Sequence, residues 1–351
     1  MIEVTQAGLY CRAGDFHIDP WRPTSRAIVT HAHSDHARYG SERYLTSTEG
    51  EHVLRKRLGE NVQIDTLAYG ESIDLNGVNV SLHPAGHVLG SSQVRLEYRG
   101  EVWVVTGDFK LGSDATCSEF EPVACHTLIS ECTFGLPIYR WEKDETLFAS
   151  INAWWRNNAA EGRPSVLFAY SLGKAQRLIA GVDASIGPIF CHGAVEGINR
   201  AYRETGIALP ETHYAGRDGA ADRWSSGLIV APPSTLGSVW LRKFKKASTA
   251  FASGWMMVRG NRRRRNVDRG FVVSDHADWN GLIETIDASQ AERVLLTHGQ
   301  TGPMVRYLQQ QGLEADALST LFTGEDDDMA VDTDTEDDEA AVSGQEGDRS
   351  A

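Results

Sequence analysis

Three histidines and one aspartate stand within six residues near the start of the chain, at His31, His33, Asp35 and His36. Such groups are costly to crowd together unless a positive charge organises them. On an extended stretch His31 and His33 point the same way, and the turn that follows can direct Asp35 and His36 toward a second centre. Imidazole and carboxylate are ligands expected for zinc, manganese or iron. The spacing therefore predicts a metal site rather than four solvated surface side chains.

Three further His or Asp residues stand at the ends of short apolar runs elsewhere in the chain. His87 lies in the segment PAGHVLGSS, Asp108 ends the run VVTGD, and His298 follows the run VLLT. A lone histidine in such a place is more often structural, but three such residues beside an HxHxDH motif favour one shared site. A carboxylate in the position of Asp108 could bridge two ions.

Short strands must position these side chains. Apolar runs between glycine and polar residues predict strands over 27–30, 78–82, 94–97 and 102–106. Helix-like apolar spacing predicts helices over 147–157 and 174–182, around a strand at 165–170 and before a strand at 227–231. Strands over 271–274 and 293–297 then alternate with helices over 279–288 and 302–311. The pattern predicts an α/β core that an insertion interrupts and the C-terminal part completes.

The net charge of −14 comes mostly from one end of the chain. Residues 325–351 contain 12 Asp or Glu and one Arg, so they carry −11 of it. This tail has no aromatic residue, and its like charges predict disorder from about Gly324. The rest is nearly neutral, which leaves a polyanionic substrate possible because local patches decide such binding. Five scattered cysteines without a CxxC pair argue against a zinc ribbon or a disulfide framework.

Basic residues gather in one later segment. Between Arg242 and Arg269 there are ten Lys or Arg and one acid, including the run Arg262, Arg263, Arg264 and Arg265. Since this segment leads directly into FVVSDHADW, we predict that it binds the phosphate backbone of a nucleic acid. The turn SLGK, which ends at Lys174, could also receive a phosphate at a helix start, although a plain strand-to-helix turn is the alternative. It is not a Walker A loop.

The segments THAHSDHA, PAGHVLGSS and VVTGDF resemble the metallo-β-lactamase superfamily. The closer resemblance is to its nucleic-acid-cutting β-CASP branch, through Glu131 in LISECTFG, His276 in FVVSDHADW and His298 in LLTHGQ. The stretch FASGWMMVRGNRRRRNVDRG is similar to the bacterial ligase-associated DNA exonucleases of that branch. The resemblance covers roughly residues 5–315. It implies a four-layer αβ/βα metallo-β-lactamase sandwich with an inserted β-CASP-like cap.

The resemblance also implies a role for each motif residue. One divalent metal ion, zinc or manganese, would be held by His31, His33 and His87. A second would be held by Asp35, His36 and His298, and Asp108 would bridge the two. Asp35 counts also among the catalytic residues, with His276 as the group that protonates the leaving oxygen and Glu131 as the group that orients its ring.

The predicted organisation has four parts. Residues 1–144 form the first part of the core, 145–255 the cap, 256–323 the completion of the core with the basic segment, and 324–351 the acidic tail. No apolar run of membrane-spanning length and no signal peptide is evident, so we expect a cytoplasmic protein.

We predict a two-metal DNA exonuclease that acts in repair alongside a ligase and a helicase. An RNA-processing ribonuclease of the same branch is the first alternative, and a small-molecule metallohydrolase on the same scaffold is the second. A non-catalytic scaffold subunit is the third, but such a protein would be expected to have lost ligands, and none is missing here.

Overall fold

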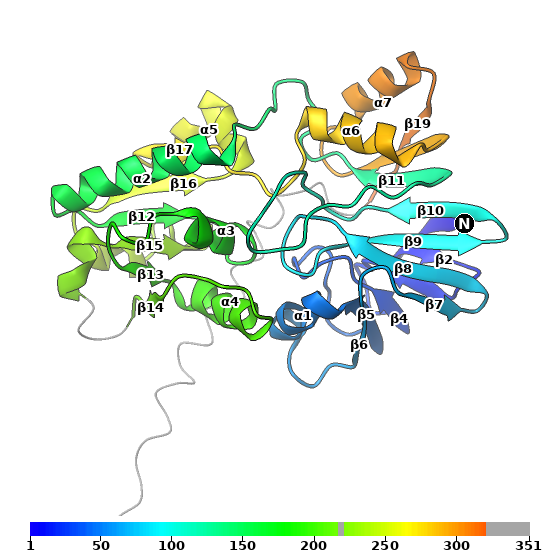
Figure 1. Cartoon of the computed structure of the whole chain (residues 1–351), viewed down its shortest axis with the longest axis horizontal. Coiled ribbons are helices and arrows are strands. Elements are labelled where there is room, and N and C mark those ends of the chain that lie inside the picture. The colour runs from blue at the N-terminus through cyan, green and yellow to red at the C-terminus, as the bar shows by residue number, and fades with distance from the viewer. Residues whose placement is uncertain (217–220, 321–351) are drawn as a thin grey trace, which may run out of the picture.

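The computed structural model describes residues 1–216 and 221–320, which form three β-sheets and their covering helices (Figure 1). The acidic segment 324–351, predicted to be a disordered tail, lies outside the described residues. No helix of the described part is long and apolar enough to span a membrane. The mixed α/β class predicted from the sequence is confirmed.

The first sheet is built from the N-terminal strands in chain order. Its strands are β1 (Ile2–Thr5), β2 (Gly8–Cys11), β3 (Phe16–Ile18), β4 (Arg26–Ile28), β5 (Arg43–Ser47) and β6 (Ile64–Leu67). The first three strands run antiparallel, and β3 to β6 run parallel. The short α1 (Glu51–Leu58) follows β5 and packs on the outer face of this sheet.

The second sheet joins the middle of the chain to its C-terminal part. In order across the sheet its strands are β19 (Glu314–Ala317), β18 (Arg293–Thr297), β11 (Thr127–Glu131), β10 (Glu101–Val105), β9 (Ser92–Tyr98), β8 (Val78–Pro84) and β7 (Ser72–Leu75). Strands β10, β11, β18 and β19 are parallel to one another, whereas β7 to β10 form an antiparallel meander. The four strands predicted at 78–82, 94–97, 102–106 and 293–297 are therefore confirmed.

The first two sheets pack face to face. Side chains such as Phe16 and Ile28 of the first sheet share one buried cluster with Val80, Val94 and Ile129 of the second. Alternation along the strands explains this, because every second side chain of β8 and β9 points into the same layer. On its outer face the second sheet is covered by α6 (Trp279–Ser289) and α7 (Thr301–Gln310). The layers thus run helix, sheet, sheet, helix (Figure 1).

The third sheet is made by residues that leave the second sheet after β11 and return at β18, its immediate neighbour. It is entirely parallel, in the order β14 (Thr212–Tyr214), β13 (Ile189–Cys191), β15 (Leu228–Ala231), β12 (Ser165–Phe168), β16 (Ser248–Ala252) and β17 (Arg269–Phe271). Its helices are α2 (Asp144–Ala160), α3 (Lys174–Gly181), α4 (Gly193–Glu204) and α5 (Arg259–Arg264). The first two cover one face of the sheet, while α4 also packs against α1 of the core.

Two predictions about the end of this region were wrong. The strand predicted at 271–274 ends at Phe271, because its pairing partner β16 ends at Ala252. Residues 256–323, which include β17, were also predicted to complete the core. Strand β17 pairs instead with β16 in the third sheet, so the inserted region reaches past that predicted boundary.

Candidate metal centre

The predicted site residues come together where strands of all three sheets end. Asp108 follows β10, Glu131 ends β11 and His298 follows β18, and these three strands are parallel neighbours. Carboxyl ends of parallel strands meet at one edge of a sheet, which explains why residues so distant in sequence become neighbours. His31 follows β4 of the first sheet, and His276 follows β17 of the third. The segment between β4 and β5 turns tightly at residues 33–37, which brings the whole HxHxDH motif to this edge.

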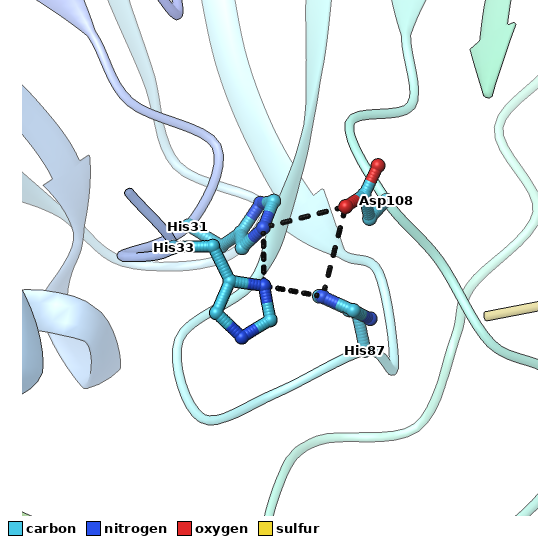
Figure 2. Close-up of side chains that lie close together, drawn as sticks. All are labelled: His31, His33, His87 and Asp108. Atoms are coloured by element: carbon cyan, nitrogen blue, oxygen red, sulfur yellow. Dashed lines mark hydrogen bonds and ion pairs between the residues drawn. The ribbon is translucent and has the colours of Figure 1, made fainter. Parts of the chain in front are cut away.

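Three histidines and Asp108 form the first group (Figure 2). His33 Nδ1 lies 3.0 Å from His31 Nε2 and 3.1 Å from His87 Nε2. The Oδ2 atom of Asp108 lies 3.5 Å from His31 Nε2 and 3.8 Å from His87 Nε2. Figure 2 shows the three rings and the carboxylate pointing at one another. One nitrogen of each histidine therefore faces a common centre, as ligands of a single cation would.

The opposite nitrogens of two of these rings bind backbone carbonyl oxygens. His33 Nε2 donates to the carbonyl oxygen of Leu172 at 3.2 Å, and His87 Nδ1 donates to that of Asp275 at 2.7 Å. A carbonyl oxygen can only accept, so the proton of each ring lies on the outer nitrogen and the inner one offers a lone pair. Outer hydrogen bonds of this kind are typical of metal-binding histidines.

Asp19, which the sequence analysis missed, orients the other two histidines of the motif. It contacts His36 directly and His31 through Thr30. His36 Nδ1 donates to Asp19 Oδ2 at 2.7 Å. Thr30 Oγ1 also donates to Asp19 Oδ2 at 2.6 Å. The lone pairs of the Thr30 hydroxyl oxygen then accept from His31 Nδ1 at 3.1 Å. Asp19 thus orients a histidine in each of two groups. Its position at the end of β3, directly beside β4, was the signal that could have revealed it.

The second group consists of His36, Asp108 and His298. His36 Nε2 lies 3.4 Å from Asp108 Oδ2, and His298 Nδ1 lies 3.6 Å from Asp108 Oδ1. Asp35 extends this group, since its Oδ2 lies 3.3 Å from His36 Nε2. A small cavity lined by Asp35, His36, Glu131 and His298, among other residues, adjoins it. Asp108 is therefore the one residue common to both groups, as its predicted bridging role requires.

Buried polar atoms without hydrogen bonds test whether cations fit here. Among the residues that the structure describes, Asp35 Oδ1, His36 Nε2 and Asp108 Oδ1 are buried and have no hydrogen-bond partner. Leaving such atoms unsatisfied is costly, so a bound species is the natural explanation. All three lie in the second group or bridge it to the first. The donor set, imidazole nitrogens and carboxylate oxygens, fits divalent zinc or manganese.

Burial and neighbouring charges shift the acidities at this centre. Burial lowers the pKa of His31 and of His87 well below the usual range, which keeps them in the neutral form that binds metal. For His36 burial acts in the same direction. Attraction to the carboxylates of Asp35, Asp108 and Asp19 outweighs it and raises the pKa of this imidazole well above its usual value. A surplus of carboxylate thus surrounds the second group and favours a positive charge there.

Glu131 and His276 form a hydrogen-bonded pair beside Asp108. His276 Nδ1 lies 2.9 and 3.0 Å from the two carboxylate oxygens of Glu131, and both residues are almost fully buried. The backbone N–H of Phe109 donates to Glu131 Oε1 at 2.8 Å, which anchors the carboxylate. The aromatic ring of Phe134 lies 5.9 Å from the His276 ring, and the Trp141 indole N–H donates to the His276 carbonyl at 2.9 Å. The ring is therefore held from several sides.

Of the residues predicted to bind nucleic acid, the structure describes the side chains of Lys174, Arg263 and Arg265. Lys174 is only 1% exposed, and its Nζ lies 3.7 Å from Asp275 Oδ2. A buried ammonium in an ion pair is not presented to a phosphate, so the prediction that Lys174 contacts nucleic acid was wrong. Within the arginine run, Arg263 is exposed, while Arg265 lies 4.4 Å over the ring of Phe251. The side chains of Arg262 and Arg264 lie outside the described residues.

A neighbouring basic segment lies on the same side of the third sheet. Residues 242–246 carry four exposed cations, and Phe244 between them packs in the same buried cluster as Phe251. Because the Arg265 guanidinium covers Phe251, the two basic segments share this face. The exposed cations of the first segment are Arg242, Lys243, Lys245 and Lys246.

Comparison with known proteins extends these observations. No protein-family model matches the chain. Over 327 residues, or 92% of its length, the chain is 33% identical to a probable DNA ligase of Opitutus terrae and spans 31% of that protein. Over 186 residues it is 30% identical to cleavage and polyadenylation specificity factor 73 of Drosophila melanogaster, covering 48% of this chain and 27% of the relative. Over 125 residues it is 29% identical to endoribonuclease YSH1 of Saccharomyces cerevisiae, covering 34% and 16%.

The chain thus spans less than a third of the length of each of these relatives. Together the similarities support the superfamily-level resemblance found in the sequence motifs. Among solved structures, a protein of unknown function from Enterococcus faecalis V583 is similar with a TM-score of 0.52 at 13% identity, over 77% of this chain and 74% of that one. This likeness is one of fold.

Proposed function

We propose that this protein is a metal-dependent nuclease with a metallo-β-lactamase sandwich and a β-CASP-like cap, and that it degrades DNA from an end. The observation that carries the proposal is the pair of ligand groups sharing Asp108, with the Glu131–His276 pair directly beside them. The order of layers supports the sandwich, and the parallel sheet inserted between β11 and β18 supports the cap.

Two divalent cations fit the two groups. One cation would be held by His31, His33 and His87. The other would be held by Asp35, His36 and His298, and Asp108 would contact both cations. Two cations at such a site supply an activated water and neutralise the charge that develops on the phosphoryl oxygens during in-line displacement.

The chain itself supplies the proton for the leaving oxygen. Glu131 is fixed by the Phe109 N–H and accepts from His276 Nδ1, so Nε2 is the ring nitrogen that would donate the proton. A histidine held by a carboxylate keeps its proton until the bond to the leaving oxygen breaks. Asp19 and the carbonyl groups of Leu172 and Asp275 keep the ligand rings oriented meanwhile.

Substrate choice rests on the basic face and on the relatives. Exposed cations at residues 242–246 and at Arg263 suit a phosphate backbone and give a small uncharged substrate nothing to bind. The relative that matches 92% of the chain bears the name of a probable DNA ligase, which supports a DNA substrate and action beside a ligase. A helicase partner remains a prediction from the family resemblance.

Ribonuclease activity is the second candidate. The similarity to an endoribonuclease and to a cleavage and polyadenylation factor favours it, although each covers less than half of the chain.

Degradation of end-labelled DNA and RNA, each single- and double-stranded, separates the candidates. The assay is run with zinc, manganese and magnesium added to metal-free protein. We expect shortening of DNA one nucleotide at a time in zinc or manganese, with little loss of RNA. Internal cleavage of RNA with intact DNA would replace the first proposal by the second, and no cleavage of either polymer would remove both.

A further inference from the structure

A network of buried charges connects the third sheet with the metal centre. Its hub is Arg177 on α3, which is 9% exposed. Arg177 Nη1 donates to the carbonyl oxygen of Ser274 at 2.6 Å and lies 3.2 Å from Asp275 Oδ1. Its Nη2 donates to Asp144 Oδ1 at 2.7 Å, and its Nε lies 3.6 Å from Asp114 Oδ2. One guanidinium thus holds four groups from three separate segments.

Two lysines complete the network. Lys174 Nζ lies 3.7 Å from Asp275 Oδ2, and Lys110 Nζ donates to Asp114 Oδ2 at 2.7 Å. Three cations therefore face three carboxylates, and only Asp144 is substantially exposed. Such charges cannot be separated in the interior without a large desolvation cost, so each member fixes the position of its neighbours.

This network ends at the backbone that orients the metal site. Asp275 provides the carbonyl oxygen that accepts from His87 Nδ1, and the next residue is His276. Leu172, two residues before Lys174, provides the carbonyl oxygen that accepts from His33 Nε2. The outer partners of two of the three histidines in the first group thus come from segments that Arg177 and Lys174 hold in place.

We infer that Arg177 is a positioning residue that locks the loop after β17 onto α3 and thereby holds His87 and His276 in their working orientations. The inference rests on the proposed metal centre and deepens it. The inserted region is then more than a cover, because it supplies the carbonyl groups that fix two ligand tautomers. Arg177 itself touches neither cation nor substrate and acts through residues 274–276.

Arg177→Met in the full-length protein tests this role, with Arg156→Met as the matched control. Arg156 lies on α2 of the same region, is exposed, and pairs with Asp183 at 3.4 Å on the surface. Zinc affinity is measured by competition with a chelator, and thermal unfolding is followed in parallel. Loss of support for a ligand histidine weakens metal binding by about 10- to 100-fold. In Arg177→Met we expect one of the two zinc equivalents to bind about 10- to 100-fold more weakly. In Arg156→Met we expect both zinc affinities to stay at the wild-type value.

Arg177→Lys and Asp144→Asn keep the inference testable where Arg177→Met fails to fold. Lysine keeps the charge but cannot reach both Ser274 and Asp144, so zinc binding should weaken less than in Arg177→Met. Asp144→Asn removes the most exposed partner and should have the smallest effect. Unchanged zinc affinity in every Arg177 variant that folds, with only a lower melting temperature, would overturn the inference and leave the proposed function intact. A wild-type protein that binds no divalent cation would instead overturn the proposed metal centre itself, and this inference with it.

Discussion

Proton donation by His276 can be tested quantitatively, because its partner Glu131 has no freedom to rearrange. Both Glu131 oxygens lie within 3.0 Å of His276 Nδ1, and Oε1 also accepts from the Phe109 N–H. In Glu131→Gln the side-chain oxygen can still accept from Phe109, but the amide NH₂ must then face Nδ1. That nitrogen becomes an acceptor, and the ring keeps a proton on Nε2 only in its neutral form. A neutral imidazole is a much weaker acid than an imidazolium.

The expected losses follow from what each change removes. His276→Ala deletes the acid and should lower kcat by about 10²- to 10⁴-fold, which is about 2.7–5.4 kcal/mol at 1.36 kcal/mol per factor of ten. Glu131→Gln keeps the ring and one proton, so its loss should be milder, about 10- to 100-fold. Because Glu131 acts through His276, the double variant should be no slower than His276→Ala alone.

Turnover of end-labelled single-stranded DNA under saturating substrate measures these effects, with metal content determined on the same samples. His52→Ala is the matched control, since this half-exposed histidine of α1 belongs to none of the ligand groups and faces Glu204 at 3.9 Å. Metal content should stay near the wild-type value in all variants. If His276→Ala loses a metal ion, His276 is a ligand and the acid role is wrong. If the two single losses multiply in the double variant, Glu131 does not act through His276.

Three further perturbations address the rest of the site. Asp108→Ala should lose at least one metal ion and nearly all activity, because two cations without the shared carboxylate repel each other; metal analysis that still finds two ions with normal turnover would refute the bridge. Asp19→Asn removes the charge that orients His36 directly and His31 through Thr30, so it should weaken metal binding by about 10- to 100-fold. Competition with a chelator measures this affinity, and an unchanged value would show that the Asp19 carboxylate is dispensable. Gln at the four cations of residues 242–246 should flatten the dependence of log DNA affinity on log salt by about three units, at roughly 0.7–0.9 per phosphate contact. Hydrolysis of a small phosphodiester should not change. An unaltered slope would mean that this segment is only solvated.

Sequence was most informative where a chemical motif followed an apolar run. Asp108, Glu131 and His298 stand at or shortly after the ends of β10, β11 and β18, and the parallel pairing of these strands was enough to bring them together. His31 follows β4 of the first sheet, which packs face to face on the second. The element bounds were also close in most cases, because alternation and helix spacing mark buried faces directly. The helix predicted at 174–182, for example, is α3, Lys174–Gly181.

The sequence was least informative where a site residue binds a backbone atom or a charged side chain that is distant in the chain. The carbonyl groups of Leu172 and Asp275 carry no side-chain signal, yet they orient two ligand histidines. Lys174 was misjudged for a related reason. Its position at a helix start suits a phosphate, and only the three-dimensional arrangement reveals that Asp275 lies against its ammonium in the interior. Asp19 was missed because its two partners, Thr30 and His36, lie 11 and 17 residues further along the chain, in the segment after β4.

Activity measured per equivalent of bound metal tests the central claim most directly. Metal-free protein is titrated with manganese or zinc, and hydrolysis of bis(p-nitrophenyl) phosphate is followed together with the number of ions bound. Two groups that share Asp108 predict that phosphodiester hydrolysis rises only as the second equivalent binds. Full activity with one ion bound, or no hydrolysis with two, would contradict the proposed two-cation phosphodiesterase.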